Sequence, residues 1–322
     1  MSNNKIDTKP QISKFNPLVS IIVITYNSAD YVIETLESVK DQSYQNIELI
    51  ISDDDSTDNT IEVCRNWIYK NKEQFVRTEL LIADKNTGIP GNCNRGVKAS
   101  KGDWLKLIAG DDMLSKDAIK FLVDFTESNK HVSAFSSNVG IYDRIFDENH
   151  LRYIRNDSEF DFFKLSASKQ FERLLYINEL SAAGIFLKRS LVLEIGGFDE
   201  RFRFIEDHPL TLNITKSGTK IFYMNKLTTK YRVHSESIIK IKDDKNKIFG
   251  DFYLKQRKFQ LIYIYPYLNW IGKFTLSYEF YRHYLMDLLK LNRNSFFGRG
   301  IHFLACSISP IKIKTNWIKK EN

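Results

Sequence analysis

The sequence predicts an α/β protein built on a Rossmann-like, doubly wound and mostly parallel sheet, followed by a helical C-terminal segment. Two observations predict this fold class. Short apolar runs typical of buried strands alternate with segments of helical periodicity through the first third of the 322 residues. Near residue 250 the composition changes, and aromatic side chains become interleaved with Lys and Arg. A hydrophobic content of 43% is enough to build a core, which excludes global disorder.

The first strand is expected over residues 18–25 (LVSIIVIT), because a nearly continuous β-branched run suits a strand that is buried on both faces. In the polar break that follows, Ser28 is expected to cap a helix over residues 29–41, whose apolar side chains share one face. A second buried strand is expected over residues 47–52, and a second helix after the acidic turn at residues 53–58.

The alternation continues with a third strand over residues 79–83 and a helix over residues 92–100, separated by a loop with two glycines and a proline. The fourth strand is expected over residues 104–109 (WLKLIA), and a later strand-like segment runs from residue 220 to residue 234. Strands that alternate with helices are joined by right-handed crossovers, which predicts parallel pairing.

Polar side chains follow three of these strands at their carboxyl ends, where open α/β sheets bind ligands. They are Tyr26 with its neighbour, the acidic run 53–58, and Asp111-Asp112 after a glycine. Adjacent carboxylates repel each other unless a cation neutralises them, and hard oxygen ligands suit Mg²⁺ or Mn²⁺ together with substrate phosphates. The alternative is an acidic turn that caps a helix starting near Ser115. The sequence contains neither G-x-x-x-x-G-K-[ST] nor a G-x-G-x-x-G after the first strand, which are the two familiar Gly-rich motifs that bind phosphate. A nucleotide would therefore be held by other groups.

A further polar cluster lies downstream, in residues 196–200 (GGFDE) and 206–209 (EDHP). Pro209 suits the first turn of a helix, which places Asp207 at a helix N-terminus, where a carboxylate is stabilised. Such a carboxylate could act as general base on an acceptor hydroxyl, and ordinary helix capping is the alternative. His234 ends the strand-like segment, although a lone histidine is more often structural than a ligand.

As a whole, these motifs resemble the family 2 glycosyltransferases, which have the GT-A fold. The resemblance spans residues 19–237, and five motifs in the same order are far more specific than any one of them. It implies an inverting, metal-dependent transferase of bacterial cell-surface polysaccharide assembly. The five matched motifs are VSIIVITYNSADYV (19–32), ELIISDDDSTDNT (48–60), NTGIPGNCNRGVKASKGDWLKLIAGDDML (86–114), GIFLKRSLVLEIGGFDERFRFIEDHPLTLNITKSG (184–218) and YRVHSES (231–237).

The resemblance also assigns the donor site. Tyr26 and Asp54 would contact the nucleobase, with Asp53 nearby, and Asn86 would be a further substrate-binding residue. The donor implied is a nucleotide-sugar, by default a UDP-sugar. The acceptor implied is a saccharide or a lipid-linked saccharide.

The resemblance also assigns a metal site and a catalytic base. Asp112 would be the principal ligand of Mg²⁺ or Mn²⁺ in an Asp-x-Asp-like motif, and Asp111 would contact sugar or ribose. His234 would be an accessory contact to metal or phosphate. Asp207 would be the catalytic base, and Glu206 beside it would bind substrate.

Two positions depart from the family pattern. Relatives often carry Arg-Asn in the helix after the third strand, where this chain has Cys93 and Asn94, so that Arg95 is the candidate to take the arginine's role. The motif after the fourth strand is Asp-Asp preceded by a glycine rather than a full Asp-x-Asp. How Asp111 and Asp112 share the metal and sugar contacts is therefore open.

The chain is expected to divide into a flexible leader (1–16), a GT-A catalytic domain (17–240) and a helical extension (241–322). Residues 251–322 hold 12 Lys or Arg against 4 Asp or Glu, so this segment carries more than the whole net charge of +7. Basic and aromatic side chains together suit the surface of an anionic membrane. Packing of the segment on the core as a helical subdomain is the alternative.

Localisation is expected to be cytoplasmic, or peripheral at the inner face of the cell membrane. The start of the chain does not read as a secretory signal, no apolar stretch is long enough to span a bilayer, and the three cysteines show no metal or disulfide spacing. A sugar-phosphate nucleotidylyltransferase is the nearest enzymatic alternative. A nucleic-acid-binding or membrane-binding protein without catalysis would leave the acidic loops unexplained, so nucleic acid is not an expected partner.

Overall fold

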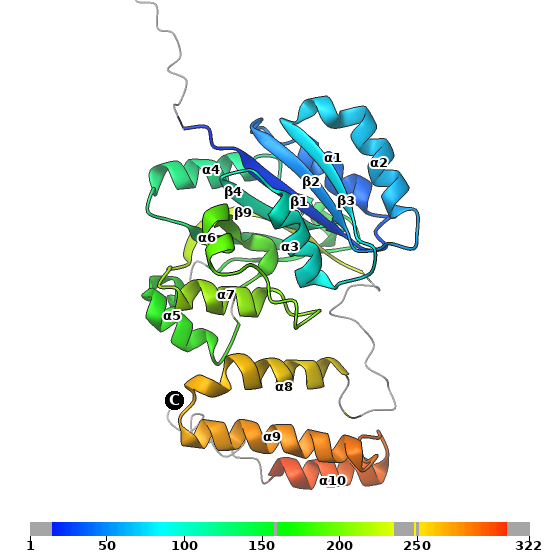
Figure 1. Cartoon of the computed structure of the whole chain (residues 1–322), viewed down its shortest axis with the longest axis vertical. Coiled ribbons are helices and arrows are strands. Elements are labelled where there is room, and N and C mark those ends of the chain that lie inside the picture. Colours follow the sequence, from blue (N-terminus) through cyan, green and yellow to red (C-terminus); the bar gives the residue numbers. More distant parts are fainter. Residues whose placement is uncertain (1–14, 158–159, 179, 235–247, 249–250, 308–322) are drawn as a thin grey trace, which may run out of the picture.

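The structure is a computed structural model, which describes residues 15–157, 160–178, 180–234, 248 and 251–307. Figure 1 shows a twisted sheet with helices on both faces, and three C-terminal helices stacked below it. This arrangement confirms the expected α/β class. The first residues of the expected leader, 1–14, and the end of the last matched motif, 235–237, lie outside the described residues.

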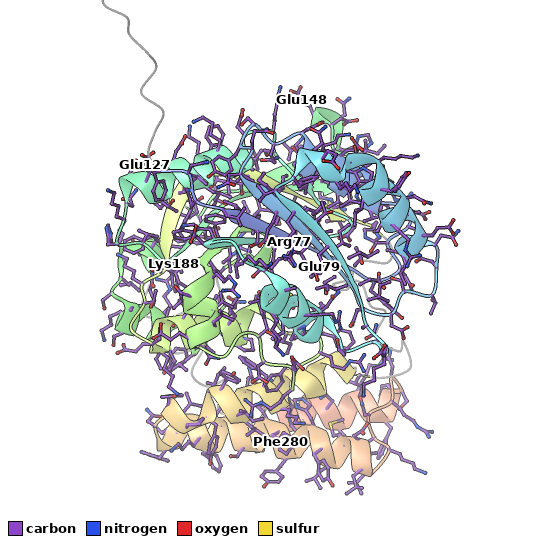
Figure 2. All side chains as sticks on the ribbon, turned by 45° about the horizontal axis from the view of Figure 1, so that its top comes forward. Arg77, Glu79, Glu127, Glu148, Lys188 and Phe280 are labelled. Carbon is purple, nitrogen blue, oxygen red and sulfur yellow. The ribbon has the colours of Figure 1, made fainter. Side chains whose placement is uncertain are left out.

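Four strands form the parallel half of the sheet, in the order β3-β2-β1-β4. Their bounds, β1 Val19–Thr25, β2 Ile47–Asp53, β3 Arg77–Ile82 and β4 Trp104–Ala109, lie close to the ranges predicted from the sequence. All of β1 and β2 is buried except the partly buried Ile24, as their continuous apolar runs predicted. Figure 2 shows Arg77 and Glu79, which form an ion pair, close together on the edge strand β3.

The second half of the sheet is mixed rather than parallel. β8 runs antiparallel between β4 and β6, and β9 runs parallel to β6. β5 and β7 add antiparallel pairs to β9 and β6. The five strands are β5 Met113–Leu114, β6 Ala134–Asp143, β7 Leu151–Arg155, β8 Phe186–Lys188 and β9 Phe222–Val233. Because β8 pairs only with Trp104 and Leu105 of β4, the sheet opens beyond these residues, toward the carboxyl end of β4.

Helices cover the two faces of the sheet and close two hydrophobic cores. The helices on one face are α1 Val32–Lys40, α2 Thr60–Asn71 and α4 Ala118–Ser128. Those on the other face are α3 Ile89–Ala99, α5 Ala167–Leu174, α6 Arg189–Glu194 and α7 Asp207–Lys216. Alternate β1 residues contribute to opposite cores, with Ile21 in the first and Ile22 in the second. This alternation explains why β1 shows no polar face.

α1 begins at Val32 rather than at residue 29, so the prediction that Ser28 caps it is wrong. The Ser28 carbonyl accepts the N–H groups of Tyr31 at 3.0 Å and Val32 at 2.9 Å, which makes a separate turn before the helix. The cap position is Tyr31, whose side chain makes no capping hydrogen bond. The polar residues after β1 therefore form a loop at the sheet edge and not the first turn of the helix.

α3 begins at Ile89, earlier than the predicted residue 92. Gly88 precedes it with a φ of 84°, a left-handed conformation that glycine adopts easily, and Pro90 occupies the first turn. This early start brings the N-terminus of α3 to the same edge of the sheet as the acidic loop after β2.

Three helices follow the sheet: α8 Asp251–Tyr263, α9 Trp270–Leu288 and α10 Phe296–Ser307. α8 packs on the sheet and its helices, because Phe259 is buried in the second core with ring centroids 5.6 Å from Phe202 and 4.8 Å from His208. The part of the extension nearest the domain thus packs on the core, which was the alternative to a membrane surface. No described helix combines the length and the apolar character needed to cross a membrane.

Candidate active site

The loops that follow β1 and β2 are joined at the carboxyl edge of the sheet. The Asn27 N–H donates to the Ser56 hydroxyl at 2.9 Å, and the Asn27 side-chain oxygen accepts the Thr57 N–H at 2.8 Å. Asp53 is buried and accepts the Thr25 hydroxyl at 2.7 Å and the Ser56 N–H at 2.8 Å. The Asp53 carboxylate therefore stabilises the acidic turn through hydrogen bonds, as in an Asx turn. Tyr26 is 51% exposed, so its ring is accessible at the rim.

Asp54 is buried and surrounded by hydrogen-bond donors. Its carboxylate accepts the Thr87 N–H at 3.0 Å, the Thr87 hydroxyl at 2.6 Å and the Gly88 N–H at 2.7 Å. Arg95 completes the set with an ion pair at 3.1 Å. Burial alone would raise the pKa of Asp54, but these hydrogen bonds outweigh it and hold the pKa below its usual value. Asp54 thus fixes the loop before α3 as a charged anchor.

Arg95, the candidate for the role of the arginine found in relatives, reaches from α3 to the acidic loop after β2. It also donates to Asn92 at 2.9 Å, three residues earlier on the same face of α3, and to the Asp53 carbonyl at 3.1 Å. Cys93 instead points into the second core. The residue of α3 that reaches the acidic loop is therefore Arg95.

The loop that carries Asn86 also meets the loop before α7. The Arg203 guanidinium donates to the Asn86 carbonyl at 3.1 Å and to its side-chain oxygen. The Ile89 N–H donates to the Arg203 carbonyl at 3.0 Å. A chain of contacts therefore runs from Asp54 through this loop to the residues just before Asp207.

Asp111, Asp112 and His234 lie together beyond β4. The Asp111 carboxylate is 2.9 Å from His234 Nε2. Asp112 is buried, and its carboxylate accepts the Arg232 N–H at 2.9 Å. Burial and the neighbouring Asp111 raise the pKa of Asp112 well above its usual value. The alternative of a helix cap does not hold for this pair, because α4 begins only at Ala118 and its cap position is Asp117.

The chemistry of these side chains suits a divalent cation. His234 Nε2 and the Asp111 carboxylate are joined by a hydrogen bond of 2.9 Å, so a nitrogen and an oxygen that could serve as ligands lie side by side, next to Asp112 in the chain. A cation would also offset the repulsion from Asp111, which adds to burial in raising the pKa of Asp112. Among the described residues, no three acidic, His or Cys side chains form a complete metal cluster. Mg²⁺ and Mn²⁺ sites of this kind are commonly completed by water and substrate phosphate.

Arg232 is a residue whose role the sequence did not predict. Its guanidinium donates to the Asp111 carbonyl at 2.7 Å and to the Arg144 carbonyl, and forms an ion pair with Glu34 of α1. The guanidinium also lies 4.9 Å from the Tyr31 ring. Arg232 therefore holds the Asp111-Asp112 turn in two ways: its backbone N–H binds the Asp112 carboxylate, and its guanidinium binds the Asp111 carbonyl. Only its place two residues before His234 could have drawn attention to it.

Lys106 was also missed, although a lysine inside the apolar run WLKLIA is a visible anomaly. It is fully buried in β4, and its ammonium donates to the Ala183 carbonyl. Burial lowers the pKa of Lys106 to about 7, while the attraction of Asp112 opposes that shift. Lys106 therefore lies close enough to Asp112 for the two groups to interact electrostatically.

Asp207 is the first residue of α7, as predicted. Its carboxylate accepts the His208 N–H at 2.7 Å and the Asn178 side-chain amide at 2.9 Å, and these two donors fix its orientation. Glu206 precedes it, and burial together with the charge of Asp207 raises the pKa of Glu206 to about 8. The Glu206 carboxyl therefore favours its protonated, neutral form at neutral pH.

Tyr231 connects the two acidic groups electrostatically. Burial raises the pKa of its phenol, and the charges of Asp112, Asp111 and Glu206 raise it further. The Asp pair after β4 and the acidic pair at α7 therefore act on one side chain. Because β1 pairs in parallel with both β2 and β4, the loops that carry Tyr26, Asp54 and Asp111 leave the sheet at one rim.

A separate pocket of about 620 Å³ lies away from these residues, between α3, α8 and the loop of residues 196–201. Its lining includes Lys98, Asp199 and Tyr263 and none of the predicted site residues. Asn94 also lines the pocket. Its side-chain oxygen accepts the Phe198 N–H at 2.8 Å, and its side-chain amide donates to Glu200. The pocket is therefore not the expected donor site.

Proteins with similar sequences identify the family of this chain. The family model described as glycosyl transferase family 2 matches residues 20–192. The Escherichia coli protein named UDP-Glc:alpha-D-GlcNAc-diphosphoundecaprenol beta-1,3-glucosyltransferase WfaP is 30% identical over 227 residues, which cover 69% of this chain and 79% of that protein. An uncharacterized glycosyltransferase of Haemophilus influenzae is 31% identical over 51% of this chain, and the match spans only 62% of that protein.

Solved structures share the fold at low sequence identity. Staphylococcus aureus TarS in complex with UDP-GlcNAc has a TM-score of 0.59 and 17% identity, and covers 89% of this chain and 79% of its own. The mannosyltransferase PcManGT from Pyrobaculum calidifontis, in complex with GDP-Man and Mn²⁺, has a TM-score of 0.53 and 17% identity, covering 79% of this chain and 64% of its own. These similarities confirm the predicted fold.

Proposed function

This chain belongs to the family 2 glycosyltransferases, and on that basis we propose that it transfers a sugar from a UDP-sugar to a saccharide or lipid-linked acceptor with inversion at the anomeric carbon. The donor class is supported by the UDP-Glc in the name of the E. coli relative and the UDP-GlcNAc bound to TarS. The name of that relative also includes an acceptor linked to diphosphoundecaprenol. We extend these properties to this chain because its own site has suitable chemistry.

The observation that carries the proposal is the meeting of distant acidic loops at one rim. Asp54 is joined through the loop before α3 to the residues before Asp207. The parallel pairing of β1 with β4 brings the Asp111-Asp112 turn to the rim where Tyr26 follows β1. A transferase of activated sugars needs acidic groups on two sides of the reacting carbon, one near the leaving diphosphate and one near the acceptor.

Asp207 is the proposed catalytic base. The Asn178 amide and the His208 N–H orient its carboxylate, so that it can take the proton of the acceptor hydroxyl as that oxygen attacks the anomeric carbon. Tyr26 and the loop anchored by Asp53 and Asp54 are proposed to receive the nucleobase. Asn86 and Glu206 are proposed to contact the substrate from the opposite loops.

Asp112, Asp111 and His234 are proposed to hold Mg²⁺ or Mn²⁺. When bound there, the cation would neutralise the charge that develops on the departing nucleoside diphosphate. Asp111 has the more accessible carboxylate, and Asp112 is buried against Arg232. We therefore propose that both aspartates serve the metal, with sugar or ribose contacts also falling to Asp111.

Assembly of a cell-surface polysaccharide at the inner face of the cell membrane is the proposed setting, because it supplies lipid-linked acceptors to an enzyme on the cytoplasmic side. This part of the proposal rests on the acceptor in the name of the E. coli relative.

A donor screen tests the proposal directly. The shift in melting temperature on adding UDP-, GDP- and dTDP-sugars with Mn²⁺ should be largest for a UDP-sugar. In a coupled assay with acceptor, the protein should then release UDP. Release of pyrophosphate from a sugar phosphate and UTP, without UDP release from any nucleotide-sugar, would instead identify a nucleotidylyltransferase.

A further inference from the structure

The two faces of α9 are inverted relative to an ordinary surface helix. Its buried face carries Glu279 and His283 beside Leu276 and Met286. Glu279 is paired there with Arg282, and burial next to Arg282 lowers the pKa of His283 to about 3. Glu279, Arg282 and His283 are therefore turned toward the protein.

The outward face of α9 is apolar and aromatic. Its residues recur three and four positions apart, so they lie in one stripe along the helix. The exposed fraction is 78% for Trp270, 61% for Phe274 and 61% for Leu288. The exposed members of the stripe are Trp270, Ile271, Phe274, Tyr281, Tyr284, Leu285 and Leu288.

α10 extends this apolar surface. Phe296, at its start, is 91% exposed, and Phe297 and Leu304 are also exposed. In Figure 1, α9 and α10 lie side by side as the lowest layer, with α8 between α9 and the catalytic domain. Figure 2 labels Phe280 on α9 and shows side chains projecting from the underside of this helical pair. Exposed apolar area of this extent marks an interaction surface.

The charge of the hairpin formed by α9 and α10 favours an anionic lipid surface over a second copy of the chain as its partner. Residues 270–304 hold five Lys or Arg against two Asp or Glu, and Lys290, Arg293 and Arg299 are exposed. A second copy of the chain would bring a further set of like charges to the interface, which is unfavourable. An anionic lipid surface is complementary to these cations and also accommodates Trp, Tyr and Phe at the level of its headgroups.

We propose that α9 and α10 form a membrane-facing surface that lies flat in the headgroup region of an anionic bilayer. The aromatic stripe enters the edge of the acyl layer, and Lys290, Arg293 and Arg299 contact the phosphates. The surface is independent of the residues proposed for sugar transfer, so it holds or fails separately from the proposed function. It differs from a spanning anchor, which none of the described helices can form.

Flotation of the full-length chain with vesicles tests this surface. The wild type should float with phosphatidylglycerol vesicles and far less with phosphatidylcholine vesicles. A stripe variant (Phe274→Ser with Leu288→Ser) and a charge variant (Lys290→Glu with Arg293→Glu) should each lower the partition coefficient by about tenfold or more. The matched control is Tyr69→Ser, which removes an exposed aromatic residue of α2 at a distance from the hairpin and should float like the wild type.

Two further measurements make every outcome decisive. Circular dichroism should show the same helix content in all variants, and transfer to a water-soluble acceptor should be unchanged, which separates this test from that of the proposed function. The proposal is overturned if the wild type does not float, or if the stripe variant floats equally well. It is also overturned if light scattering shows a dimer that the stripe variant loses, because a second copy would then cover the surface.

Discussion

At the scale of single residues, Arg232 shows how much of the site depends on a side chain that touches no expected substrate. It holds the Asp111 carbonyl, the Arg144 carbonyl and the α1 residue Glu34 together. Positioning residues of this kind commonly change metal affinity or activity by about 10-fold to 100-fold when they are removed.

We therefore predict that Arg232→Met raises the Mn²⁺ concentration needed for half-maximal transfer by about tenfold or more. The lost guanidinium frees the Asp111-Asp112 turn, while the backbone N–H that binds Asp112 remains. Metal titrations of the initial rate give this value. Arg232→Lys should recover part of the loss, and Arg152→Met, which removes an exposed pair with Asp143, should behave as the wild type. Equal Mn²⁺ requirements in Arg232→Met and the wild type would contradict this role.

Glu206 gives a prediction about pH. Its carboxyl has a pKa of about 8 in the folded chain against an ordinary 4.5, so the folded state keeps a proton that the unfolded state releases between these values. The free energy of unfolding of the wild type should therefore fall as pH rises from about 4.5 to about 8. Glu206→Gln removes this loss, so its stability relative to the wild type should increase across that window. Denaturant unfolding at several pH values measures the difference, and a constant difference would refute the raised pKa.

The sequence identified candidate site residues more reliably than the groups that form hydrogen bonds with them. Asp54 was predicted from its place after a buried strand, but its donors Thr87, Gly88 and Arg95 lie far along the chain and became visible only in the fold. Lys106 could have been noticed, because a lysine in an apolar strand must be accommodated somehow.

At the scale of elements, the loop before α7 depends on a tight fit between Gly197 and α3. Gly197 has a φ of 76°, and a Cβ atom there would lie 2.5 Å from the Asn94 side-chain oxygen. That oxygen accepts the Phe198 N–H at 2.8 Å, so the contact sets the path of the chain toward Asp207.

Gly197→Ala should lower the free energy of unfolding by about 1–3 kcal/mol and reduce the rate of transfer. Gly196→Ala is the matched control, because its φ of 85° is equally strained for alanine but nothing lies within 4 Å of the added Cβ. The extra loss in Gly197→Ala therefore measures the contact with Asn94. Equal losses in the two variants, by chemical denaturation, would remove any special role for that contact.

The strands of the parallel half could be predicted because buried parallel strands are continuous apolar runs. Helix starts were less predictable: Ser28 looked like a cap, but its carbonyl closes a separate turn before α1. The mixed second half of the sheet could not be foreseen, since β8 is only three residues long and its pairing with both β4 and β6 is a tertiary event.

At the scale of the whole molecule, the C-terminal segment resolves into two parts with different surroundings. α8 is packed into the second core through Phe259, whereas α9 and α10 expose their aromatic side chains. Composition alone left both arrangements open, because an aromatic residue is compatible with a core and with a membrane surface. Only the burial of each side chain separated them.

The meeting of loops from four distant parts of the chain is also a property of the whole molecule. Motif order predicted it through the resemblance, and the carboxyl ends of parallel strands explain it physically. The second acidic group, at α7, could not be placed by strand order alone, because α7 reaches the rim through the contact between Arg203 and the Asn86 loop.

The most direct test compares sugar transfer by the wild type and Asp207→Asn, with donor affinity measured on the same samples and Asp124→Asn, an exposed residue of α4, as the control substitution. The asparagine keeps the shape of the side chain but cannot take a proton. We predict that transfer falls by about 100-fold or more in Asp207→Asn while the affinity for the UDP-sugar stays within about threefold of the wild type, and that Asp124→Asn changes neither. Undiminished transfer by Asp207→Asn would contradict the proposal that the acidic groups at this rim form one transferase site.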